Sequence, residues 1–150
     1  MATRSKDPIT CHVLDTAKGV PGANIDVVLT CLSCPLGSLK AKTNSDGRIS
    51  NWQKLDVSSR ENSRMVDVEY HGATDIFCHV LQKGVDSSSD SVDSEKKYSL
   101  WKLEFDTETY FGQGNTFFPT VEVTFQVEAG GLYHVPLLLG PYSYTTYRGS

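Results

Sequence analysis

Two of the four histidines lie in apolar segments with the composition of β-strands. His12 is followed by Val13 and Leu14, and His134 by Val135. Imidazole titrates near neutral pH, so two converging histidines can take a proton from water and return one to a leaving nitrogen. A lone strand histidine is more often a structural or surface residue. The pair is therefore a candidate acid–base site only if the fold brings the two rings together.

An arginine follows directly after a predicted tight turn. The turn is Asn44-Ser-Asp-Gly-Arg48, whose residues favour a sharp reversal. A guanidinium group can donate two parallel hydrogen bonds to a planar anion or a carbonyl oxygen. Because an exposed arginine after such a turn is common, a purely structural surface role is the alternative for Arg48.

The last eleven residues, 140–150, contain three tyrosines, whereas chain ends usually fray and are polar. This composition predicts an anchored end. The tyrosines can pack with their hydroxyls satisfied locally. Alternatively, Tyr147, Arg148 and Ser150 can present hydrogen-bond donors to a flat heterocycle.

Cys31 and Cys34, with His71, Cys78 and His79 further along, contain the ligand types of a zinc site. The spacing is loose and there is only one close cysteine pair, so ordinary cysteines are favoured and no metal is expected. The sequence lacks a glycine-rich phosphate loop and a Gly-x-Ser-x-Gly motif, which disfavours nucleotide binding and α/β-hydrolase chemistry.

Length and charge restrict the partners. A chain of 150 residues fits a single domain, 1–150. The net charge is −4 and no dense run of Lys and Arg is present, so nucleic acid is not an expected partner. No apolar run approaches the roughly 20 residues that a membrane helix needs, so no membrane association is expected.

The first ten residues lack the apolar middle of a secretory signal, which predicts a cytoplasmic protein. The cysteines, Cys11, Cys31, Cys34 and Cys78, are then expected to be free thiols. The chain does not end in the peroxisomal Ser-Lys-Leu signal, which leaves the peroxisome open only by another route.

The elements that must position these residues are predicted to be strands. Three segments alternate apolar and polar residues with a period of two, as strands with one buried face do. Their apolar members are Ile25, Val27, Leu29 and Cys31; Trp101, Leu103 and Phe105; and Val121, Val123, Phe125 and Val127. Glycine-containing turn signals separate these segments, and residues 106–111 suit one short turn of helix. The predicted class is all-β.

One region lacks this alternation of apolar and polar residues. Residues 85–95 contain five serines and four acids, too polar to cover a core, and are predicted to be a solvated loop. The flanking residues 66–81 are more apolar and suit a hairpin. We therefore expect an inserted polar loop and hairpin at about 54–97.

Five motifs together resemble the 5-hydroxyisourate hydrolases of the transthyretin-like family. They are His12-Val-Leu-Asp15, Thr43-Asn-Ser-Asp-Gly-Arg48, Phe117-Phe-Pro-Thr-Val121, Tyr133-His-Val-Pro-Leu-Leu-Leu139 and Tyr147-Arg-Gly-Ser150. The final tetrapeptide is the most specific, because it separates these hydrolases from transthyretin, their hormone-carrying relative. The resemblance covers roughly residues 9 to 53 and 98 to 150.

The resemblance implies a transthyretin-like (prealbumin-like) two-sheet β-sandwich with one short helix, assembled as a homotetramer. It also implies hydrolysis of the cyclic amide of 5-hydroxyisourate to 2-oxo-4-hydroxy-4-carboxy-5-ureidoimidazoline in urate degradation, without a metal or organic cofactor. The residues it assigns to catalysis are His12, Arg48, His134 and Ser150. Those it assigns to substrate binding are His12, Arg48, Tyr147, Arg148 and Gly149.

Two other functions remain open from sequence. A transthyretin-type binding protein would hold an apolar small ligand without changing it, and a structural β-sandwich would hold none. Neither would need the polar set of His12, Arg48, His134 and the tetrapeptide, so the hydrolase is favoured.

Overall fold

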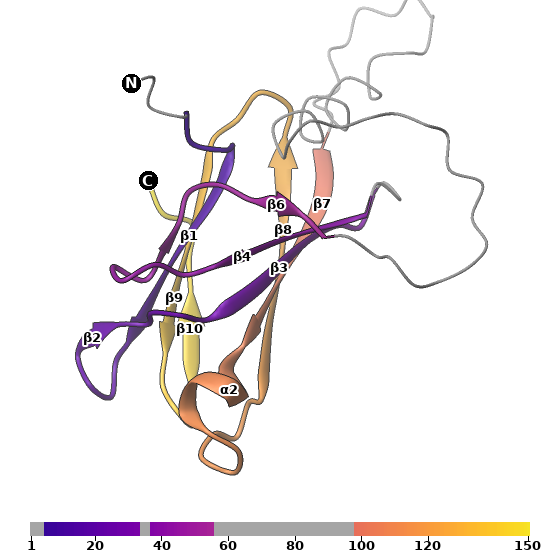
Figure 1. Ribbon diagram of the computed structural model, residues 1–150. Helices are drawn as coiled ribbons and strands as arrows, with labels where there is room; N and C mark the ends of the chain where they lie inside the picture. Colours follow the sequence, from indigo (N-terminus) through magenta and orange to yellow (C-terminus); the bar gives the residue numbers. More distant parts are fainter. Residues whose placement is uncertain (1–4, 34–36, 56–97) are drawn as a thin grey trace, which may run out of the picture.

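The computed structural model describes residues 5–33, 37–55 and 98–150, which form two β-sheets and one short helix (Figure 1). The first sheet, sheet A, contains β10 (Tyr144–Thr146), β9 (Tyr133–Leu139), β1 (Ile9–Asp15) and β2 (Val20–Pro21) in that order, with β5 (Arg48–Ile49) also pairing with β1. The second, sheet B, has the order β6 (Gln53–Lys54), β4 (Ser38–Lys42), β3 (Asp26–Cys31), β7 (Tyr98–Asp106) and β8 (Thr120–Glu128). The predicted all-β sandwich with one short helix is confirmed.

The inner faces of the two sheets form one hydrophobic core, and the alternating residues of the sequence supply it. In β3, β7 and β8 the apolar members of the predicted segments are buried, apart from the half-buried Phe125. β1 and β9 contribute their inner-facing residues from sheet A, among them Ile9, Val13 and Leu137. Burial of this kind stabilises a domain by about 25 cal/mol per Å² of apolar surface.

Sheet A has a parallel pair at its centre. β1 and β9 align in parallel over seven residues, from Ile9 opposite Tyr133 to Asp15 opposite Leu139. Two parallel strands must be joined by a crossover connection. Here the connection contains every element from β2 to β8. An early strand and a late strand are thereby brought side by side (Figure 1).

The short helix α2 (Thr107–Phe111) connects β7 to β8, close to the predicted 106–111. Asp106 precedes it as N-cap, and its carboxylate accepts a hydrogen bond from the backbone N–H of Thr109 at 3.1 Å. Such a cap satisfies a donor that the helix itself leaves unpaired.

Tyr110 of α2 joins the helix to the buried Asp15 at the end of β1. Its hydroxyl donates to the carboxylate of Asp15 at 2.8 Å, and the backbone N–H groups of Ala17 and Lys18 donate to it as well. Burial alone would raise the pKa of Asp15, but these hydrogen bonds outweigh burial and hold its pKa below the ordinary value. Burial and the adjacent carboxylate raise the pKa of Tyr110 to about 12.

Several predictions concern residues outside the described ranges: the loop 85–95, the hairpin 66–81, and the zinc candidates Cys34, His71, Cys78 and His79. They stay predictions. Among the described residues, no helix is long and apolar enough to cross a membrane.

Tyr110→Phe should lower the free energy of unfolding by about 1 to 3 kcal/mol at pH 7, because it removes a hydrogen bond to a buried carboxylate. A carboxyl whose pKa is depressed by folding contributes stability above its unfolded value and loses it as the pH falls. The difference should therefore shrink below about pH 4. Denaturant titration at pH 7 and pH 3 measures it. Tyr142→Phe, at an exposed tyrosine, serves as control; an equal Tyr110→Phe loss at both pH values would contradict the assignment.

Candidate functional site

The two candidate histidines meet on the outer face of sheet A. Along β1, Thr10 and His12 point away from the core, and along β9, His134 does so too. The parallel register sets Thr10 opposite His134 and His12 opposite Pro136. The two imidazole rings lie with centroids 6.5 Å apart and planes tilted by 34°. The convergence on which the acid–base prediction depended is present.

Arg48 lies beside His12 on the same face, because β5 pairs antiparallel with β1 and sets these two residues opposite each other. The turn before it is held by Asn44, whose side-chain oxygen accepts from the backbone N–H groups of Asp46 at 3.0 Å and Arg48 at 2.9 Å. Gly47 adopts a φ of +72°, a conformation that favours glycine. Its carbonyl oxygen accepts from the N–H of Val13 at 2.8 Å, which fixes the turn to β1.

The surroundings of His134 favour its neutral form. Its pKa is lowered first by burial, then by the positive charge of Arg48 and, to a smaller extent, by His12 and Lys6. Desolvation and nearby cations both penalise an imidazolium. His134 therefore has one unprotonated ring nitrogen available as a base at neutral pH.

The last residues of the chain fold back onto His134. The N–H of Gly149 donates to the carbonyl oxygen of His134 at 2.8 Å, and the hydroxyl of Thr146 donates to that of Pro136 at 2.8 Å. A Cβ on Gly149 would lie 2.6 Å from Cδ2 of the His134 ring and 3.1 Å from Cγ of Pro136. Only glycine lets the backbone pass this close to the imidazole. The predicted anchoring of this segment is confirmed.

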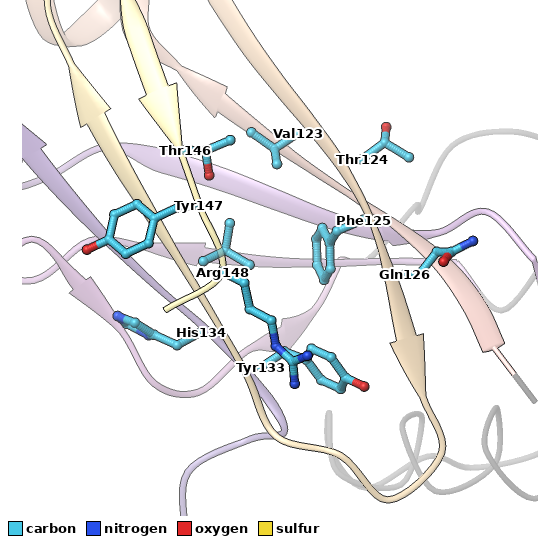
Figure 2. Close-up of a pocket in the computed structure, with 10 residues that line it drawn as sticks. Val123, Thr124, Phe125, Gln126, Tyr133, His134, Thr146, Tyr147 and Arg148 are labelled. Carbon is cyan, nitrogen blue, oxygen red and sulfur yellow. The ribbon is translucent and has the colours of Figure 1, made fainter. Parts of the chain in front are cut away.

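Neighbouring residues of the tetrapeptide point in different directions. Figure 2 shows Tyr147 on the same side of the strand as His134, whereas Arg148 reaches toward the ring of Tyr133. The guanidinium carbon of Arg148 lies 4.8 Å from the centroid of that ring, within the range of a cation–π contact. Tyr133 is itself fixed, since its hydroxyl accepts from the N–H of Glu128 at 2.8 Å. Tyr147 and Ser150 are exposed.

A pocket of about 270 Å³ lies behind the tetrapeptide, between β8 and the end of the chain (Figure 2). It is lined by Val123, Thr124, Phe125, Gln126, Tyr133, His134, Val135, Thr146, Tyr147 and Arg148. Half of these residues belong to the motifs around Tyr133 and Tyr147, whereas the four from β8 were expected only as members of a strand. Because His134 and Tyr147 line it together with Arg148, the pocket is continuous with the His134 side of the candidate site.

The described residues hold no group of three or more His, Cys, Asp or Glu side chains arranged to bind a metal. Cys31 lies in sheet B, whereas the histidine pair lies in sheet A. Cys11 is a free, fully buried thiol whose pKa is raised to about 12 by that burial. A thiol with so high a pKa is a poor nucleophile.

One residue of the site escaped the sequence motifs. The hydroxyl of Thr10 lies 2.8 Å from Nδ1 of His134, across the β1–β9 pair. A threonine two positions before His12 shares its face of the strand, which was the one available signal, but the distant partner was not visible in the sequence.

Comparison with known proteins identifies a family and a shared fold. A family model described as the HIUase/Transthyretin family matches residues 9–149. The 5-hydroxyisourate hydrolase of Mus musculus is 35% identical over 153 aligned positions, covering 100% of both chains. The structure of Klebsiella pneumoniae 5-hydroxyisourate hydrolase matches with a TM-score of 0.57 and 21% identity, covering 95% of this chain and 98% of that one. Sea bream transthyretin in complex with thyroxine matches with a TM-score of 0.59 and 20% identity, covering 95% of both. At these identities the two structures establish the fold alone.

Gly149→Ala should push the tetrapeptide away from His134, because the added methyl group would overlap the imidazole. We expect large shifts of the His134 ring signals in NMR spectra. Gly140→Ala is the matched control, since its added carbon would meet neighbours only at 3.5 to 3.6 Å, an ordinary contact. Unchanged His134 signals in Gly149→Ala would contradict the close packing.

Proposed function

The chain belongs to the HIUase/Transthyretin family, and we propose that it hydrolyses the cyclic amide of 5-hydroxyisourate to 2-oxo-4-hydroxy-4-carboxy-5-ureidoimidazoline, a step of urate degradation. The observation that carries this proposal is the meeting of His12, His134 and Arg48 on one face of sheet A, with Gly149 against the His134 ring. The named activity of the mouse relative supports it.

The imidazole pair would activate water. One or both histidines take a proton from a water molecule, whose oxygen forms a bond to the ring carbonyl carbon. The carbon–nitrogen bond of the cyclic amide then breaks, and the proton passes from the imidazolium to the leaving nitrogen. His134 suits the first step because its lowered pKa leaves it unprotonated at neutral pH.

Arg48 would bind the substrate and stabilise charge. Arg48 is paired with His12 across β5 and β1, and its charge acts on His134. Its guanidinium can donate to the oxygen-rich heterocycle and to the negative charge that develops on the attacked carbonyl oxygen. Tyr147, Gly149 and Ser150 would add donors at the other edge of the site. For Arg148, the contact with Tyr133 supports holding the tetrapeptide in place, and through it the substrate contacts of its neighbours.

The binding-protein alternative is less well supported. An apolar ligand, bound without reaction, gains nothing from two histidines and an arginine on the same face. The match to sea bream transthyretin concerns the fold, which both functions share. The local chemistry therefore favours the hydrolase.

We further propose that the chain forms a homotetramer. β8 is the edge of sheet B and β10 the edge of sheet A, and the pocket lined by both strands places these edges on the same side of the sandwich. Within the described part of the chain, neither strand has an outer neighbour. An unpaired edge is a template for pairing with another strand, so two copies could extend both sheets at once.

The purified protein should accelerate the decay of 5-hydroxyisourate, generated from urate with urate oxidase and followed by ultraviolet absorbance, with a chelator present. Decay at the spontaneous rate would refute the hydrolase. A requirement for added zinc would instead revive the Cys31 and Cys34 site.

His12→Ala, Arg48→Ala and His134→Ala should each lower turnover by about 10²- to 10⁴-fold, the usual contribution of a positioned acid, base or charge-stabilising group. His71→Ala and His79→Ala, outside the family motifs, are matched controls that should keep activity. Losses below about tenfold would mean that other residues carry the chemistry. Thermal unfolding measured alongside separates a catalytic defect from a lost structural hydrogen bond.

Size-exclusion chromatography with light scattering should show a tetramer, and deletion of residues 85–95 should preserve both the tetramer and activity, because so polar a segment does not suit a packed interface. A stable, fully active monomer would contradict the assembly. Loss of the tetramer on deletion would contradict the expectation for that segment.

A further inference from the structure

Thr10 makes the one side-chain hydrogen bond that the described residues offer to the His134 ring. Its Oγ1 lies 2.8 Å from Nδ1 of His134, and the contact is partly buried. The two side chains are neighbours because the parallel register of β1 and β9 sets Thr10 directly opposite His134. The contact is therefore built into the sheet rather than made by a mobile surface side chain.

The donor and acceptor roles in this contact depend on the tautomer of the ring, and a second contact of the same hydroxyl points to one of the two arrangements. A threonine hydroxyl has one proton to donate and two lone pairs to accept with. The Thr10 hydroxyl also lies 3.4 Å from the carbonyl oxygen of Tyr133, a group that can only accept. If the hydroxyl proton points to that carbonyl, the contact with His134 requires the proton on Nδ1 of the ring.

The remainder of the ring is restrained from the other side. Gly149 packs against Cδ2, the carbon bonded to Nε2, while Thr10 holds the Nδ1 side. Nε2 has no hydrogen-bond partner among the described residues. It is the nitrogen left to meet a water or a substrate.

We propose that Thr10 is a positioning residue, which holds the neutral ring of His134 with its proton on Nδ1 and the lone pair of Nε2 open to the site. Its kinetic consequence rests on the proposed hydrolase function, in which His134 takes a proton from water. A ring in the other tautomer would present an N–H there and could not accept that proton. Burial and the charge of Arg48, which lower the pKa of His134, agree with the neutral ring that this role needs.

Nitrogen-15 NMR of the imidazole rings tests the tautomer directly. In the wild-type protein above the His134 titration, Nδ1 should carry the proton and Nε2 should not. Thr10→Val keeps the shape of the side chain but removes the hydroxyl, and should give a mixture of both tautomers. A wild-type ring protonated on Nε2, or a Thr10→Val ring with an unchanged tautomer, would overturn the proposal.

Kinetics with 5-hydroxyisourate test the consequence. Thr10→Val should lower kcat by about tenfold, the factor that follows from losing one ordinary hydrogen bond, with KM changed by less than about twofold. Thr10→Ser retains the hydroxyl and should stay within about threefold of wild type. Unaltered kcat in Thr10→Val, or equal losses in both variants, would refute the role of the hydroxyl.

Thr30→Val is the matched control, because the Thr30 hydroxyl is also hydrogen-bonded, at 2.9 Å to Ser38, but lies in sheet B. It should alter neither the His134 tautomer nor kcat. A wild-type protein without activity would refute the proposed function, and the ring spectra would still decide what Thr10 does. Should valine prevent folding, the wild-type and Thr10→Ser spectra decide it.

Discussion

The parallel pairing of β1 with β9 is the constraint on which the site depends. β1 has β9 along one edge and β5 and β2 along the other, so it connects the histidine of the last long strand with the arginine of the turn. Because side chains alternate across a strand, a slip of one residue would turn His12 into the core and Cys11 out to the site. Burial of Ile9, Cys11 and Val13 opposes such a slip. Packing in the core thus fixes the geometry on the opposite face.

Much of the fold could be predicted from local sequence patterns. The alternation in β3, β7 and β8 has a period of two because one face of each strand meets the core, and that signal lies within a few residues. The helix at α2 and the turn before Arg48 are equally local, since Asp106 and Asn44 cap their own neighbours. Such features need no knowledge of distant parts of the chain.

The site was less predictable, because its contacts are distant in sequence. Thr10 and His134 are 124 positions apart, and nothing near either residue indicates the other. The side on which Arg148 lies depends on how the residues after β10 run along β9, where Gly149 forms an isolated bridge with His134. The importance of the tetrapeptide came from a family resemblance. The close packing of the Gly149 backbone against the imidazole of His134 is visible only in three dimensions.

The two ends of the β1–β9 pair favour opposite charge states: the charged form of Asp15 at one end and the neutral form of His134 at the other. At one end, Asp15 is buried, yet donors from Tyr110 and two backbone N–H groups outweigh the burial and keep its pKa low, so the carboxylate remains charged. At the other end, burial of His134 and the cation of Arg48 act in the same direction and keep the ring neutral. A charged group surrounded by satisfied hydrogen bonds is suited to holding strands and helix together. A neutral base with one nitrogen held by Thr10 and the other unpartnered among the described residues is suited to moving protons. The same register thus gives β1 a structural anchor at Asp15 and places Thr10 and His12 on the face of the proposed site.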